Sequence, residues 1–162
     1  MIKNVVVILF LFNLVACNPA QKASQNKSAS KVAPFSCLSS QNQCDVTTDL
    51  GVFTVEFSGQ TEQGKVKTEL PFHIQLTFNA SMKDSQIKSV NSYLEGKSMF
   101  MGKIPVFFEQ GEKNSNVMRA ETLLVNCSEE IMTWRQWFAV EVDQGGEVVT
   151  QDFFIDFDSK RL

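Results

Sequence analysis

Four sulfur-bearing side chains fall in two short segments of the chain and form a candidate set of metal ligands. Met99 and Met101 lie two residues apart in the first segment, and Cys127 and Met132 lie five residues apart in the second. Two residues that are two apart in an extended chain project from the same side, so Met99 and Met101 would face one way. Thioethers and a thiolate are soft donors, which select Cu(I) over harder metal ions. The sequence therefore offers Met99, Met101, Cys127 and Met132 as ligands of a Cu(I) site.

The elements around these segments must bring the two sulfur pairs together. The segment at 95–103 joins the third and fourth predicted strands, and the segment at 126–134 joins the fifth and sixth. In a sandwich whose successive strands run up and down, loops alternate between the two ends. These two loops are two connections apart, so we expect them to emerge at the same end.

Alternation with a period of two residues dominates the sequence after residue 50. Between 65 and 78 the apolar residues fall on even positions and the polar ones on odd positions, which is typical of a long strand with one buried face. Pro71 lies on the polar side and indicates an edge position or a bulge. One turn of helix is expected only at 128–133. The predicted strands cover residues 52–57, 65–78, 87–94, 103–108, 119–125, 134–142 and 148–157.

Seven strands at this spacing, separated by turn sequences such as Gly145-Gly146, predict an all-β fold. An immunoglobulin-like antiparallel β-sandwich of about seven strands is the favoured architecture. A small β-barrel is the alternative. The predicted domain covers residues 35–162.

The N-terminus has the features of a lipoprotein signal peptide over residues 1–16. Lys3 supplies a positive charge, and the apolar run Val5–Val15 is too short to span a bilayer but has the length of a signal-peptide core. The run ends in Leu14-Val15-Ala16-Cys17, which looks like a lipobox, so Cys17 is the predicted lipidation site. The alternative is an ordinary signal peptide followed by a chance cysteine.

Residues 17–34 are predicted to form the lipidated cysteine and a flexible polar tether. The segment after Cys17 is rich in Ala, Ser, Gln, Asn and Lys and has no aromatic residue, so it cannot build a core. These features predict a protein anchored by lipid at the periplasmic face of a bacterial membrane. Asn18 directly after the lipidated residue resembles the sorting signal of Gram-negative lipoproteins for the outer membrane.

Three cysteines remain once Cys17 is assigned to lipid, and three pairings among them are possible. A bridge from Cys37 or Cys44 to Cys127 would close a long loop and would stabilise the fold more on the chain-entropy model. Proximity in the sequence favours Cys37–Cys44 instead. That pairing, which we prefer, leaves Cys127 as a free thiol.

The segment Leu94–Gly102, followed by a strand and then by a Cys and a Trp a few residues apart, resembles small exported sandwich domains of the YtkA-like and FixH-like group. In those domains a Met-x-Met-Gly segment after the third strand recurs, and Met99, Met101 and Gly102 match it here. The resemblance implies a copper-handling accessory of respiratory oxidase assembly, with another periplasmic or inner-membrane protein as its partner. This chain departs from richer copper sites because it has no histidine nearby.

Plainer interpretations exist for each of these residues. Methionine fills irregular gaps in cores, and a free cysteine is often a small buried hydrophobe. His73 falls on the polar face of its strand and is expected at the surface. The acids Asp156 and Asp158 are expected to be solvated. With no metal, the chain would be a protein-binding or structural lipoprotein of the cell envelope.

Enzymatic activity and nucleic-acid binding are not expected. A single histidine leaves no base to activate a serine or cysteine nucleophile, and no zinc-ligand spacing or phosphate-binding glycine loop is present. Four of the 15 Lys and Arg residues and none of the 18 Asp and Glu residues precede residue 35. The domain therefore carries 11 basic and 18 acidic residues, a net charge of −7, whereas nucleic-acid binding requires a basic face.

Overall fold

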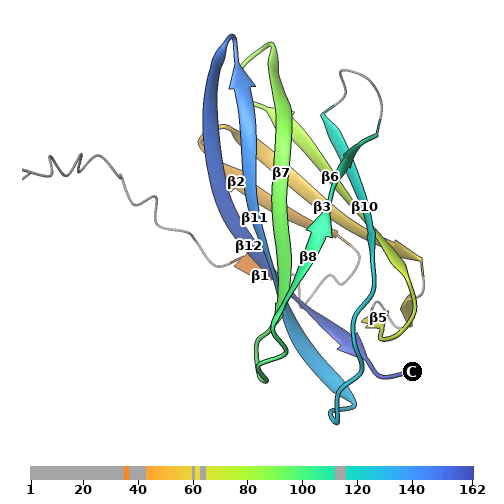
Figure 1. The fold of residues 1–162 in the computed structure, drawn as a ribbon. Coiled ribbons are helices and arrows are strands. Elements are labelled where there is room, and N and C mark those ends of the chain that lie inside the picture. Colours follow the sequence, from red (N-terminus) through yellow and green to blue (C-terminus); the bar gives the residue numbers. More distant parts are fainter. Residues whose placement is uncertain (1–34, 37–42, 60, 63–64, 112–115) are drawn as a thin grey trace, which may run out of the picture. The chain divides into compact units, whose positions relative to one another are not determined.

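The computed structural model describes residues 35–36, 43–59, 61–62, 65–111 and 116–162, and all of its regular elements are strands (Figure 1). The N-terminal predictions, including the lipidation of Cys17 and the role of Cys37 in a disulfide, lie outside the described residues. The strands are β1 Phe35–Ser36, β2 Gln43–Thr48, β3 Gly51–Gly59, β4 Thr61–Glu62, β5 Lys65–Lys67, β6 Phe72–Ala80, β7 Ser85–Gly96, β8 Lys103–Phe107, β9 Glu109–Gln110, β10 Val117–Thr122, β11 Ile131–Gln144 and β12 Glu147–Lys160.

The strands form two sheets, which confirms the prediction of an all-β sandwich. One sheet has the order β4-β5-β12-β11-β7-β8, with β1 paired to β12, and the other has the order β2-β3-β6-β10-β9. Most neighbours are antiparallel, but β1 and β5 each run parallel to β12. The longest unit is the hairpin of β11 and β12, which pair along their full length across the Gly145-Gly146 turn. Both glycines have positive φ, the conformation that favours glycine in such a turn.

The core lies between the two sheets and contains a layer of phenylalanine rings. Phe53 on β3 stacks on Phe78 of β6 with ring centroids 4.5 Å apart, and it also contacts Phe153 of the other sheet at 5.2 Å. Phe153 in turn stacks on Phe138 at 4.8 Å. This continuous aromatic layer joins the sheets, and burial of its apolar surface is the main stabilising contribution.

The single strand predicted over 65–78 is wrong in one respect, because the chain changes sheets within it. β5 pairs with β12, whereas β6 pairs with β3 and β10. Glu69 has a φ of 61° in the connecting turn, and its amide donates to Leu124 O at 2.8 Å. Pro71 lies directly before β6, at this break rather than at a sheet edge or a bulge.

Two further segments of the chain, β2 and residues 128–133, differ from the prediction. β2 was not predicted, although it pairs with β3 from Gln43 to Thr48. The helical turn expected at 128–133 is wrong, because residues 128–130 bend and β11 begins at Ile131. No helix among the described residues is long and apolar enough to cross a membrane.

Candidate functional site

The structure places the two sulfur-bearing loops at the same end of the sandwich, as the strand order predicts. Gly96 at the end of β7 is the register partner of Trp134 on β11, and the amide of Lys97 donates to Thr133 O at 3.0 Å. Figure 1 shows the β7–β8 and β10–β11 connections at its lower end. We call this region the loop end, and it comprises residues 65–71, 96–103, 123–131 and 160–162.

Met101 and Met132 meet at Gly96. A Cβ atom built on Gly96 would overlap Met132 Cε and the backbone oxygen of Met99, and it would lie 3.2 Å from Met101 Cγ. The two thioether side chains are therefore neighbours, and glycine is required at the point where they converge. Met132 is 2% exposed and belongs to the core, and Met101 is half-buried against it.

Cys127 and Met99 occupy different environments at this end. Cys127 is free and half-buried, packs against the core, and donates a weak hydrogen bond from Sγ to Glu129 O at 3.8 Å. Met99 is 38% exposed. The structure therefore brings Met101 and Met132 together, adds Cys127 at the edge of the same core, and leaves Met99 at the surface.

The other cysteine that the structure describes, Cys44, is disulfide-bonded. Its partner lies outside the described residues, so the Cys37–Cys44 pairing stays a prediction. His73 is exposed on β6, with Nδ1 3.5 Å from Glu121 Oε2. No group of three or more His, Cys, Asp or Glu side chains in the described part of the chain could hold a metal ion.

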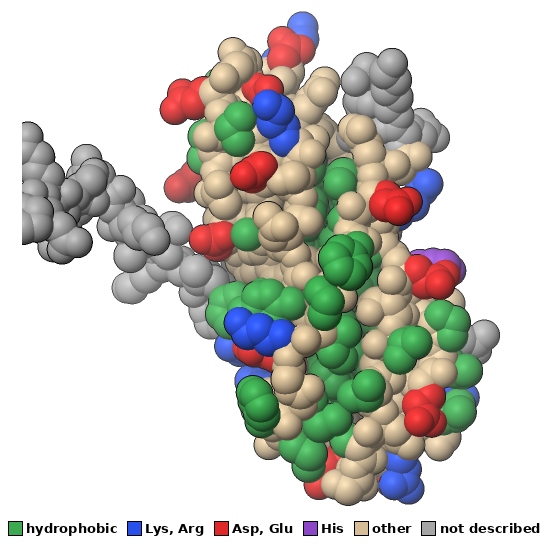
Figure 2. All heavy atoms as spheres, in the orientation of Figure 1, with side chains coloured by type: hydrophobic (Ala, Val, Ile, Leu, Met, Phe, Trp, Pro, Cys, Tyr) green, Lys and Arg blue, Asp and Glu red, His purple; other side chains and the backbone are tan. Residues whose placement is uncertain are grey.

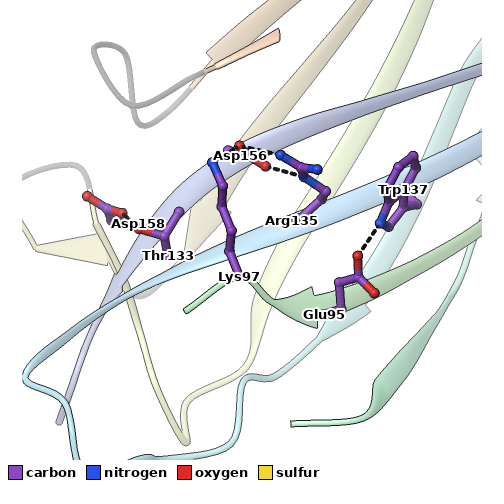
Figure 3. A network of polar contacts seen from close by, with 7 residues as sticks. All are labelled: Glu95, Lys97, Thr133, Arg135, Trp137, Asp156 and Asp158. Atoms are coloured by element: carbon purple, nitrogen blue, oxygen red, sulfur yellow. Dashed lines mark hydrogen bonds and ion pairs between the residues drawn. The ribbon is translucent and has the colours of Figure 1, made fainter. Parts of the chain in front are cut away.

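An ion-pair network around the buried carboxylate of Asp156 fixes the start of the β7–β8 loop (Figure 3). Arg135 donates from Nε to Asp156 Oδ1 at 2.7 Å and from Nη2 to Oδ2 at 3.0 Å. Lys97 Nζ donates to the same Oδ2 at 2.6 Å. The Asp156 side chain is 5% exposed, so the expectation that Asp156 is solvated is wrong. It is buried because both of its oxygens have cationic partners.

Opposing effects set the pKa of the Asp156 carboxyl. Burial raises it, but the hydrogen bonds and charges of Arg135 and Lys97 together outweigh burial and hold the pKa of Asp156 below its usual range. The hydrogen bond to Asp156 likewise raises the pKa of Arg135 against partial desolvation. The network is therefore ionised at neutral pH.

The same network makes Lys97 the anchor of the loop that carries Met99 and Met101. Its amide is held by Thr133 on β11 and its ammonium by Asp156 on β12. Two further contacts fix the surrounding backbone elements: Glu95 accepts a hydrogen bond from Trp137 Nε1 at 2.6 Å, and Thr133 Oγ1 donates to Asp158 Oδ1 at 2.8 Å.

The outer face of the larger sheet carries an aromatic row that the sequence patterns did not single out. Trp137 contacts Phe154 on one side at a centroid distance of 4.9 Å and Tyr93 on the other at 6.2 Å. Lys103 Nζ lies 4.1 Å above the Tyr93 ring. A hollow of about 740 Å³ adjoins this row, with Tyr93, Trp137 and Ala139 in its lining.

Comparison with known proteins identifies similar folds but no family. No family model and no curated protein matches the sequence significantly. A DUF4785 family protein from Legionella pneumophila subsp. pneumophila str. Philadelphia 1 is similar with a TM-score of 0.54 and 14% identity, covering 70% of this chain. The match spans 29% of that protein, so this chain corresponds to a small part of it.

A superoxide reductase (neelaredoxin) from Ignicoccus hospitalis is similar with a TM-score of 0.40 and 12% identity, covering 67% of this chain and 80% of the reductase. A second structure of that reductase is similar with a TM-score of 0.39. The similarity to the Legionella protein concerns the fold alone.

Proposed function

We propose that this chain is a lipid-anchored protein of the bacterial envelope whose β-sandwich binds Cu(I) at the loop end. The observation that carries the proposal is the convergence of the Met101 and Met132 side chains at Gly96, with a free, half-buried thiol at Cys127 on the same end. Cu(I) prefers soft sulfur ligands, and these are the groups gathered here.

In this proposal Cys127 supplies the charged ligand and Met101 and Met132 supply neutral ones. Binding would release the Cys127 proton, because the thiolate is the metal ligand. Met99, at the surface of the same loop, would contact the ion when it enters or leaves. With Cu(I) bound in this way, the protein would store or transfer copper and would catalyse no reaction.

Lipidation of Cys17 would hold the domain at the periplasmic face of a membrane, with the outer membrane favoured by Asn18. The resemblance of the Met-x-Met-Gly segment to copper-accessory domains supports a role in respiratory oxidase assembly, with a periplasmic or inner-membrane protein as partner. Such a partner would exchange Cu(I) at the loop end.

A second candidate function is protein binding without metal. It is favoured by the complete burial of Met132, which is typical of a gap-filling core residue. The hollow beside Trp137 and Tyr93 would then be the contact surface.

Competition for Cu(I) against a chromogenic chelator distinguishes the two functions. Cys127→Ser should weaken binding most, because a hydroxyl is a hard donor that does not ionise near neutral pH. Met101→Leu and Met132→Leu should weaken it less, and Met99→Leu least. The chain offers matched controls in Met118, which is buried in the other sheet, and Met82, which is exposed. If the wild-type chain fails to compete with a weak chelator, the copper function is wrong and protein binding remains.

A further inference from the structure

The loop end gathers most of the exposed large hydrophobic side chains of the described residues. Nine such side chains are exposed, and six of them belong to the loop end. Phe100 is 93% exposed at the tip of the β7–β8 loop. Figure 2 shows hydrophobic side chains concentrated over the lower half of one face. The six are Met99, Phe100, Leu123, Val125, Ile131 and Leu162.

Hydrogen bonds join the segments that carry these side chains into one surface. The amide of Arg161 donates to Glu130 O at 2.8 Å, and the amide of Leu162 donates to Thr68 Oγ1 at 3.3 Å. The bond from Lys97 to Thr133 attaches the β7–β8 loop to the same end. The segments that carry the apolar side chains therefore lie together at one end although they are far apart in the sequence.

The charge of the loop end differs in sign from that of the opposite end. Among the described residues the loop end has six basic side chains, of which Lys97 is paired with Asp156, and three acidic ones. They are Lys65, Lys67, Lys97, Lys103, Lys160, Arg161, Glu69, Glu129 and Glu130. The opposite end, taken as the described residues of 48–51, 80–86, 110–117 and 143–148, has one basic and four acidic side chains, which are Lys83, Asp49, Asp84, Asp143 and Glu147. A domain with net negative charge thus has one basic, apolar end.

We infer that the loop end docks on the surface of an anionic lipid bilayer. Exposed aromatic and aliphatic side chains surrounded by lysine and arginine are the combination that binds the interface of such membranes. The 17 residues between Cys17 and Phe35 span at most about 56 Å, so an anchored domain stays within reach of the bilayer. The acidic end would face away from the lipid because like charges repel.

This inference rests on the lipid anchor of the proposed function and not on copper binding. Docking would place the Met101–Met132 cluster next to the membrane surface.

Sedimentation with lipid vesicles tests the inference without the anchor. The chain from Asn18 onward keeps every core residue, because the core lies within 44–157. We expect it to bind vesicles of phosphatidylethanolamine and phosphatidylglycerol, and to bind phosphatidylcholine vesicles much more weakly. Binding to the anionic vesicles should fall as salt is raised.

Matched substitutions assign the binding to the loop end. Phe100→Ser combined with Leu123→Ser should lower the partition coefficient on the order of tenfold, because each change removes an apolar side chain from the lipid contact. Met82→Ser combined with Val148→Ser, at the opposite end, should leave it unchanged. Neither pair includes a proposed copper ligand. A loss of lipid binding can therefore be distinguished from a loss of Cu(I) binding.

Three results would overturn docking on lipid. The first is the absence of binding to anionic vesicles. The second is equal binding of the wild type and the loop-end variant, which would assign the binding to the lysines of the tether. The third is self-association of the wild type in the absence of lipid that the loop-end variant abolishes. That result would make the surface an interface between protein copies.

Discussion

Lys97 Nζ lies 2.6 Å from Asp156 Oδ2, and this contact joins the loop that carries Met99 and Met101 to the longest hairpin of the fold. Asp156 is also the direct register partner of Arg135, so one carboxylate holds two cations from different elements. The position of the candidate copper loop therefore depends on a residue of β12 that is 59 positions away in the sequence.

Replacing Asp156 by Asn tests this network. We expect the free energy of unfolding to fall by about 1–3 kcal/mol at neutral pH, because the change removes the carboxylate that Arg135 and Lys97 both bind. Arg135 and Lys97 are partly exposed, so water compensates for some of the loss. Denaturant unfolding measures the effect, and Asp152→Asn, on the exposed part of the same strand, is the control. An Asp156→Asn variant as stable as the wild type would contradict the role of the network.

The difference in stability between the wild type and Asp156→Asn should depend on pH, and its direction follows from the pKa of Asp156. The pKa of Asp156 is lower in the folded chain than in the unfolded chain, so the unfolded state takes up its proton first as pH falls. The stabilisation by Asp156 is present above the pKa of an Asp in the unfolded chain, about 3.9. It is lost as the pH falls through the lower pKa of Asp156 in the folded chain. Unfolding curves from pH 7 to pH 2 should thus show the wild type and Asp156→Asn converging only at the acidic end. Convergence near pH 6 would require a different titrating group.

Gly96→Ala should destabilise the protein by about 1–3 kcal/mol and weaken Cu(I) binding. The added Cβ overlaps Met132 Cε and the Met99 carbonyl, so either the thioether or the loop must move. Thermal unfolding and chelator competition measure the two effects, and Ser98→Ala in the same loop is the control. Unchanged stability would show that the methionines do not converge at Gly96.

Period-two alternation predicts β3 and β11 well, because each buries alternate residues in one phase. Alternation also locates β7 and β12, although β7 changes from odd to even buried positions at a register shift against β11, and β12 is buried on both faces over residues 153–157. It could not reveal the break between β5 and β6. Val66, Thr68 and Phe72 are all buried on even positions, so the pattern continues across the change of sheet. β2 has only Cys44 and Val46 as apolar positions, too few to distinguish it from a loop.

The sulfur residues of the candidate site could be selected from their chemistry and from the order of the loops. The ion pairs that position them could not. Arg135 and Asp156 both point outward from their strands, and an outward charge is normally solvated. Only the pairing register of β11 and β12 places the two side chains opposite each other, and one strand alone does not contain that information.

Lipidation is tested by Cys17→Ser in cells that process lipoproteins. We expect the substitution to abolish labelling with a fatty-acid analogue and to leave the precursor unprocessed by the lipoprotein pathway. Cys127→Ser is the control and should be labelled like the wild type. Labelling that survives at Cys17→Ser would contradict the anchor.

Mass mapping of unreduced protein tests the cysteine assignment. We expect a peptide that joins Cys37 to Cys44, and alkylation of Cys127 after unfolding without reduction. The structure already has Cys44 in a disulfide and Cys127 free. A bridge from Cys44 to Cys127 would remove the thiol and with it the strongest proposed copper ligand.

X-ray absorption spectroscopy of the Cu(I)-loaded chain is the decisive test of a sulfur-ligated copper site at the loop end, because it identifies the atoms bound to the metal. We expect a first coordination shell of sulfur atoms only, from Cys127, Met101 and Met132, and loss of one sulfur in Cys127→Ser. The buried control Met118→Leu and the exposed control Met82→Leu should leave the spectrum unchanged. A shell dominated by nitrogen or oxygen, or a chain that retains no copper after desalting, would contradict it and leave a packed sandwich whose methionines serve only the core.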